Sequence, residues 1–380
     1  MSQLESKTLF ESLEHIEDPR SDRTKRHQLV DILVIAVCAT ICGADGWQQI
    51  AAFGVAKHEW LKEFLELPNE IPSPDTFARV FQMIKPKVFQ KVFMEWVSAA
   101  VQKSGGDLVN IDGTQLRGTR KKKSYENDGK EGLRIVSAWA ARNRIVLGQV
   151  KTDEKSNEIT AIPKLLELLE LTGCIVTIDA MGCQTAVVKQ IVEQEGDYVI
   201  SLKGNQGNLH KDIEDYFCWA TQTKFNAIEY DTSRTIEKGH GRIEERRLYV
   251  TEDIEWLGQK EEWAGLRSII MVEAQREVIG REPTIERRYF ISSLEANAKQ
   301  AMKAVRGHWK IENQLHWCLD VGFREDACRI RTGHAPENLA VLRHIALNLL
   351  KQERSCKLGI NAKRLKAGWD NRYLSKVLNI

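Results

Sequence analysis

Two aspartates in this sequence each follow an apolar run that has the composition of a buried strand. Asp112 follows "LVNI", Asp179 follows "IVTI", and small residues come directly after both. If the two strands are adjacent and parallel, both carboxylates emerge at the same edge of the sheet. Carboxylates held together repel each other unless a cation neutralises them. Because Mg²⁺ and Mn²⁺ take oxygen ligands, the pair indicates a divalent-metal site.

An aspartate at the end of a strand has a common structural role as well. Its side chain often caps the turn or helix that follows. For either Asp112 or Asp179 alone, capping is the favoured interpretation. For two aspartates that end the first and fourth strands of one sheet, 67 residues apart in the chain, metal binding is favoured.

A third carboxylate must come from elsewhere, and Glu312 is the best candidate. Its helix has an apolar side that would pack it on the sheet, and Trp309 on that side is expected in the core. His308 and His316 lie four residues before and after Glu312, so a zinc site of His308, Glu312, His316 and Cys318 is an alternative, although this spacing matches no common zinc motif. The rival third carboxylates are Glu158, Glu325 and Asp326.

Such a site points to phosphoryl transfer. Two metal ions about 4 Å apart activate a water or a 3′-hydroxyl and stabilise the leaving oxygen, so no side-chain nucleophile is required. The sequence accordingly has neither a nucleophile elbow nor a P-loop. "IDGT" also resembles the haloacid-dehalogenase phosphatases, but the position of their nucleophilic aspartate is Asn110 here, which cannot form an aspartyl-phosphate.

The elements that must position these residues follow from hydrophobic periodicity. Residues 1–104 are predicted to form a helical N-terminal domain, in which "SPDTFARVFQMI" has a helix-entry signal at Ser73. From 105 onward the order is three strands, helix, strand, helix, strand, which is the chain order of an RNase H-like domain. We therefore predict an α/β fold with an RNase H-like core, a mixed sheet flanked by helices, within residues 105–350. A mostly β insertion is expected at about 204–290, and 351–380 is expected to be a basic C-terminal tail.

Composition places few limits on function. The chain has 380 residues, a net charge of +2 and basic clusters at 20–27, 117–123 and 363–366, which modestly favour a nucleic-acid partner. The eight cysteines form no CxxC pair, so reduced thiols in a cytoplasmic protein are expected. The apolar stretch 32–44 is too short to span a bilayer and is expected to form a buried helix.

Together the motifs are specific enough to identify a family. "IDGTQLRGT", "VKTDEKSNEITAIPKLL", "TIDAMGCQ", "YVISLKGNQ", "HGRIEERR" and "VRGHWKIENQLHWCLDVGFRED" resemble the H-repeat-associated transposases, a DDE insertion-sequence family, over nearly the whole chain. The resemblance implies an RNase H-like catalytic core with a β-rich insertion before the last catalytic helix. Carried over to matching positions, it implies that Asp112, Asp179 and Glu312 are both the catalytic triad and the ligands of two Mg²⁺ or Mn²⁺ ions.

The resemblance also implies a reaction and its partners. The enzyme would nick double-stranded DNA at the terminal inverted repeats of an element, and the exposed 3′-hydroxyls would attack target DNA. A homodimer on DNA, in the cytoplasm and at the nucleoid, is expected, with no membrane partner. The alternatives are an RNase H-like nuclease that does not join strands and an inactive DNA-binding relic. Six residues are predicted to contact DNA: Lys203, Asn205, Arg242, Arg246, Arg306 and Lys310.

Overall fold

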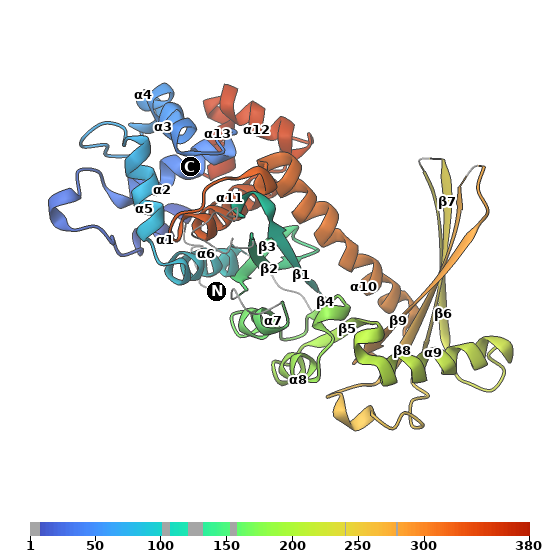
Figure 1. Ribbon diagram of the computed structural model, residues 1–380. Coiled ribbons are helices and arrows are strands. Elements are labelled where there is room, and N and C mark those ends of the chain that lie inside the picture. Colours follow the sequence, from blue (N-terminus) through green and yellow to red (C-terminus); the bar gives the residue numbers. More distant parts are fainter. Residues whose placement is uncertain (1–7, 101–106, 121–131, 153–157, 240, 279) are drawn as a thin grey trace, which may run out of the picture. The chain divides into compact units, whose positions relative to one another are not determined.

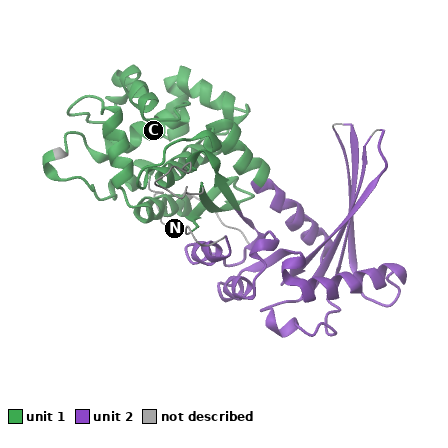
Figure 2. Cartoon of the chain, viewed as in Figure 1, with its two compact units in different colours: residues 1–102, 113–155, 312–380 green, residues 103–112, 156–311 purple. Residues whose placement is uncertain are grey.

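The computed structural model describes residues 8–100, 107–120, 132–152, 158–239, 241–278 and 280–380. The chain forms two compact units, which are coloured separately in Figure 2. Each unit is assembled from interleaved stretches: residues 1–102, 113–155 and 312–380 form unit 1, and residues 103–112 and 156–311 form unit 2. These two units are not divided in the same way as the predicted domains, so the domain boundaries predicted near 104 and 350 stay predictions.

Unit 1 is mainly helical. The apolar stretch at 32–44 lies mostly in helix α2, whose residues from Ile32 to Ala36 are fully buried, so it forms a core helix as expected. Ser73 caps α5, accepting a hydrogen bond from the backbone N–H of Thr76. The N-terminal helices are α1 (Leu9–Glu14), α2 (Leu29–Ile41), α3 (Trp47–Ala56), α4 (His58–Leu61), α5 (Pro74–Met83) and α6 (Pro86–Ala100).

The C-terminal part of unit 1 begins with a long buried helix, α11 (Ala335–Gln352). The predicted basic tail, 351–380, contains two further helices, α12 (Ile360–Trp369) and α13 (Asn371–Leu378). Lys363 and Arg364, two of the three basic residues at 363–366, are buried and donate hydrogen bonds to the backbone carbonyls of Leu350 and Thr40, respectively. These two cations hold helices together, so they contribute to the core of unit 1 and not to a basic surface.

The strands follow the order predicted for an RNase H-like core. Strand β1 (Leu108–Leu116) is shared, with its first five residues in unit 2 and its last four in unit 1. In unit 1 the hydrogen-bonded order is β3-β2-β1, and β2 (Leu133–Ala140) pairs antiparallel with β3 (Ile145–Lys151). In unit 2, β1, β4 (Ile175–Ile178) and β5 (Asp197–Leu202) are adjacent and parallel.

Two helices make the parallel connections of unit 2. Helix α7 (Glu158–Leu166) precedes β4, and α8 (Thr185–Glu193) joins β4 to β5. The three-strand run followed by these crossovers confirms the predicted mixed α/β core.

The insertion differs from its prediction at its start. Residues 207–222 form a regular helix, α9 (Gly207–Gln222), rather than β structure. Its buried side chains Leu209, Ile213 and Phe217 recur every four residues, which is the helical period. The β part follows as long antiparallel strands that continue the sheet of unit 2 in the order β5-β9-β8-β7-β6 (Figure 1): β6 (Asp231–Gly239), β7 (Arg242–Thr251), β8 (Ser268–Val278) and β9 (Thr284–Ser292).

Helix α10 (Ala298–Ile311) ends unit 2 and packs on strands β4 to β7. Small residues such as Ala301, Ala304 and Gly307 lie on its buried side and let it approach the sheet closely. Trp309 is 52% exposed, and the guanidinium of Arg288 lies 5.3 Å from the centroid of its ring. The expectation that Trp309 is a core residue was wrong, because α10 turns its small residues, not this indole, towards the sheet.

Candidate active site

The two strand-end aspartates lie at one edge of the sheet in unit 2. The register of β1 and β4 pairs Leu108 with Ile175 and Ile111 with Ile178. The next residues along the two parallel strands are Asp112 and Asp179, so they stand opposite each other, about 4.8 Å apart in the backbone. Both are half-buried, and both point away from the face on which Ile111 and Ile178 are buried.

Asp179 also caps the turn that follows it. Its backbone is still extended, and its Oδ1 accepts hydrogen bonds from the N–H groups of Met181 (3.1 Å) and Gly182 (3.4 Å). These bonds fix the carboxylate while involving one of its two oxygens. Burial, with a contribution from the charge of Asp179, raises the pKa of the neighbouring Cys183 to about 12, so that thiol is protonated at neutral pH.

The loop after β5 holds the Asp179 turn in place. The side-chain amide of Asn205 donates to the carbonyl of Ala180 (2.7 Å), and that of Gln206 donates to the carbonyl of Cys183 (2.8 Å). Asn205, predicted to contact DNA, thus contacts the turn beside the aspartate. Gln206 was missed by the sequence analysis, although it is part of the same "KGNQ" stretch.

Glu312 begins the last of the three stretches that form unit 1, directly after the last residue of α10. It is exposed and is the first residue of a π-helical stretch, Glu312–His316. Such widened turns inside helices occur frequently at functional sites. Because Glu312 and the aspartates belong to different units, the position of Glu312 beside them stays a prediction.

Two of the rival third carboxylates have structural partners within unit 1. Glu325 is buried and lies 3.4 Å from the guanidinium of Arg343, which is buried as well. Burial raises the pKa of Glu325 to about 7, although Arg343 acts in the opposite direction. Asp326 accepts a hydrogen bond from the backbone N–H of Arg117. Glu158, at the start of α7, is the rival that shares unit 2 with the aspartates.

The donor chemistry fits a hard divalent ion. Asp112 and Asp179 supply carboxylate oxygens on neighbouring strands, which suits Mg²⁺ or Mn²⁺. Within the described part of the chain, no three His, Cys, Asp or Glu side chains are arranged to hold a metal ion. That result gives no support to the zinc alternative with His308, Glu312, His316 and Cys318. A pair of aspartates can still bind an ion whose other ligands are water or phosphate oxygens.

Three of the predicted DNA contacts belong to one chain of ion pairs on the insertion and α10. Glu237 binds Arg306 and, at 2.8 Å, Arg246. Glu244 binds Arg246 and, at 3.2 Å, Arg242. Arg276 also lies 3.8 Å from Glu244, so four arginines share two glutamates. This cluster, which we call the arginine chain, keeps an excess of positive charge.

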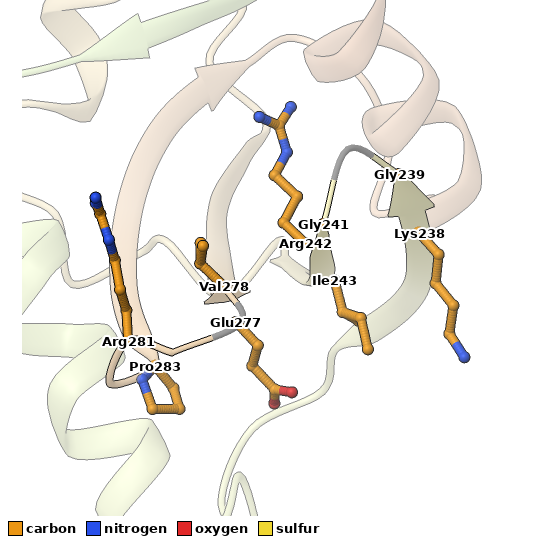
Figure 3. A pocket seen from close by; sticks show the side chains of 9 residues that line it. All are labelled: Lys238, Gly239, Gly241, Arg242, Ile243, Glu277, Val278, Arg281 and Pro283. Atoms are coloured by element: carbon orange, nitrogen blue, oxygen red, sulfur yellow. The ribbon is translucent and has the colours of Figure 1, made fainter.

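The other predicted cations are exposed: Lys203 follows β5, and Lys310 lies near the end of α10. At the tip of the insertion, a shallow cavity of about 460 Å³ is lined by Lys238, Arg242 and Arg281 among others. Figure 3 shows that these three side chains point in different directions, so the cavity is no converging anion site. In the basic cluster at 117–123, residues 121–123 lie outside the described ranges.

Among the residues that the structure describes, no helix is long and apolar enough to cross a membrane.

Comparison with known proteins gives matches over both halves of the chain. The family model described as DDE_Tnp_1-associated matches residues 10–97, and that of the transposase DDE domain matches residues 103–349. The chain is 40% identical to "H repeat-associated putative transposase YhhI" of Escherichia coli (strain K12) over 99% of its own length and 98% of that protein. It is 40% identical to "Putative transposase YncI" of Escherichia coli O157:H7, over 98% of this chain and 94% of that one.

A match to the catalytic-domain model over more than half of the chain, together with relatives that align from end to end, establishes the family. The chain belongs to the transposase DDE domain family and is of the H-repeat-associated type.

Proposed function

We propose that this protein is a divalent-metal-dependent DNA transposase that cuts the ends of an insertion sequence and joins the 3′-hydroxyls to target DNA. The observation that carries the proposal is the register of β1 and β4, which sets Asp112 opposite Asp179 at one sheet edge. Membership of the transposase DDE domain family supports the same reaction.

In this proposal Asp112, Asp179 and Glu312 hold two Mg²⁺ or Mn²⁺ ions. The chemistry that such ions supply is activation of the attacking water or 3′-hydroxyl and stabilisation of the leaving oxygen. The protein keeps the carboxylates rigid: β1 carries Asp112, the two N–H bonds fix Asp179, and Asn205 holds the turn beyond it. No side chain of this protein forms a covalent bond to DNA.

The surrounding cations would bind the DNA backbone. Lys203 and Lys310 are exposed and available for phosphates. Arg242, Arg246 and Arg306 would exchange part of their contact with Glu237 and Glu244 for phosphate oxygens, because arginine binds both groups through the same forked geometry. Since two ends must be joined, we propose a homodimer on DNA that acts at the nucleoid, in the cytoplasm.

A cleavage and strand-transfer assay tests the proposal. Purified protein is incubated with Mn²⁺ or Mg²⁺ and labelled duplexes that carry the sequences flanking its own gene. Asp112→Asn, Asp179→Asn and Glu312→Gln should each abolish cleaved and joined products. Glu158→Gln is the matched control, since it neutralises the rival carboxylate of unit 2, and it should keep activity.

The outcomes separate the possible classes. Joined products that are lost in the three variants support the transposase. Cleavage without joining would instead indicate a nuclease, and DNA binding without either reaction would indicate an inactive relic. Loss of activity in Glu158→Gln and not in Glu312→Gln would reassign the third ligand.

A further inference from the structure

A buried polar cluster lies directly beneath the two aspartates in unit 2. The side-chain hydroxyl of Thr177 donates to Oδ1 of Asn110 (2.9 Å), and Nδ2 of Asn110 donates to the carbonyl of Gly307 (2.6 Å). Nδ1 of His308 lies 3.2 Å from the same Thr177 hydroxyl. Since Gly307 and His308 are consecutive in α10, these contacts close a ring, which we call the polar ring.

The hydrogen-bond directions in the polar ring are determined by its chemistry. Asn110 uses its amide N–H on Gly307, so its oxygen must face Thr177. The single hydroxyl proton of Thr177 is thereby given to Asn110. His308 can then bind Thr177 only as a donor, so its Nδ1 carries a proton. A ring whose members all have defined donor and acceptor roles tolerates only one arrangement of the helix on the strands.

The position of the polar ring repeats that of the proposed active site. Asn110 precedes Asp112 by two residues, and Thr177 precedes Asp179 by two, so in each strand both side chains lie on the same face. His308 precedes Glu312 by four residues in the chain, and α10 leads directly into the π-helical stretch that Glu312 begins. Each residue of the proposed triad therefore has a ring member two or four residues before it in the chain.

Helix α10 also packs tightly at the same point. A Cβ atom at Gly307 would lie 2.5 Å from Cδ1 at the end of the Leu108 side chain, so that side chain would have to shift to admit one. Asn110 and Thr177 are 0% and 1% exposed. Burying these polar groups would cost free energy without the ring, since an unsatisfied buried polar group costs about 1–3 kcal/mol. An apolar layer could fill the same space. It would not, however, fix the rotation of α10 about its own axis or its height above the strands.

We infer that Asn110, Thr177 and His308 are positioning residues for the transposition reaction. They set the register between the strands that carry Asp112 and Asp179 and the end of the helix that leads into Glu312. The inference rests on the proposed function, which supplies the role of the carboxylates. None of the three residues touches DNA or metal in this role; they act through the backbone that presents the ligands.

The test compares Thr177→Val, which removes only the hydroxyl, with Thr177→Ser, which restores it. Thr251→Val is the matched control, because Thr251 is equally buried in unit 2 and donates one hydrogen bond, 2.7 Å long, to the carbonyl of Glu229. Mn²⁺ binding is measured calorimetrically and cleavage is followed at saturating Mn²⁺. Because changes around metal ligands typically cost 10–100-fold, we expect Thr177→Val to weaken Mn²⁺ binding about tenfold and to slow cleavage similarly.

Thr177→Ser should stay within about twofold of the wild type, as should Thr251→Val, although both valine variants lose thermal stability. Equal Mn²⁺ affinity in Thr177→Val and Thr251→Val would overturn the inference. If Thr177→Val does not fold, His308→Ala, compared with Lys303→Ala on the exposed side of α10, answers the same question with the same expected shift.

Failure of the proposed function has a different signature, in which wild-type protein neither binds Mn²⁺ nor cleaves DNA. Hydrogen exchange then decides whether the ring positions the helix. Thr177→Val should reduce protection of the amides from Gly307 to Ile311 more than Thr251→Val does. Equal protection in the two variants would overturn the inference independently of any metal.

Discussion

At the scale of single residues, Asp179 caps a turn and also has the placement that the proposed metal binding requires, two roles that sequence analysis treated as alternatives. Its Oδ1 caps the following turn, and its carboxylate stands opposite Asp112. The roles are compatible because a carboxylate has two oxygens with several lone pairs. Capping restricts the side chain to one orientation, which is an advantage for a metal ligand that must not move.

Asp179→Asn and Asp179→Ala should separate the two roles. Asparagine caps turns as well as aspartate, so Asp179→Asn should change the free energy of unfolding little, whereas Asp179→Ala should lower it by about 1 kcal/mol. Both variants should reduce metal-dependent cleavage by about 100-fold or more. Mutation of a residue that only contacts a metal ligand already lowers activity or metal affinity by up to about 100-fold. Urea unfolding and the cleavage assay check this; full activity in Asp179→Asn would show that capping is the only role.

At the scale of elements, helix α11 makes the stability of unit 1 depend on pH. His344 is fully buried in this helix, and burial, aided by the charges of His316 and Arg343, lowers its pKa to about 3. The folded protein thus keeps this imidazole neutral, while the unfolded chain protonates it near pH 6.5. Between these values the unfolded state binds more protons, so the contribution of His344 to stability is present above pH 6.5 and is lost as the pH falls towards 3.

Urea unfolding at pH 7, 6, 5 and 4 measures this effect. We expect His344 to contribute a slope of up to about 1.4 kcal/mol per pH unit below pH 6.5. His344→Gln should flatten that slope, whereas His15→Gln, at an exposed position, should leave it unchanged. An unaltered slope in His344→Gln would mean that the imidazole is protonated within the fold.

At the scale of the whole molecule, DNA binding must come from local charge, because the net charge of the chain is only +2. The arginine chain keeps an excess of positive charge, and its arginines are partly exposed. If these arginines bind DNA as proposed, their ion pairs with the glutamates would reduce the side-chain entropy lost on binding.

Titrations of DNA binding against salt test that view. Arg242→Ala and Arg246→Ala should each weaken binding at all sequences and reduce the slope of log affinity against log salt by about 1. Arg247→Ala is the control, because Arg247 is on the same strand with its side chain on the opposite face and pairs with Glu245. A similar loss in Arg247→Ala would place the DNA on the other face of the insertion.

The sequence by itself determined the order of strands and helices in the core, the two strand-end aspartates and the family. These features depend on local periodicity, on turn chemistry and on contiguous motifs, all of which are legible within about ten residues. Helix α9 could equally have been predicted from the four-residue spacing of its apolar residues. It was missed because the pattern of the surrounding segment favoured strands.

Only the tertiary structure decided the pairing of Ile111 with Ile178, the burial of Lys363 and Arg364, the exposure of Trp309 and the closure of the polar ring. Each of these features depends on contacts between residues that are far apart in the chain. It therefore cannot be predicted from the segment in which either residue lies. A strand sequence fixes which residues share a face, but the register with another strand depends on packing, and this register is what places the two aspartates together.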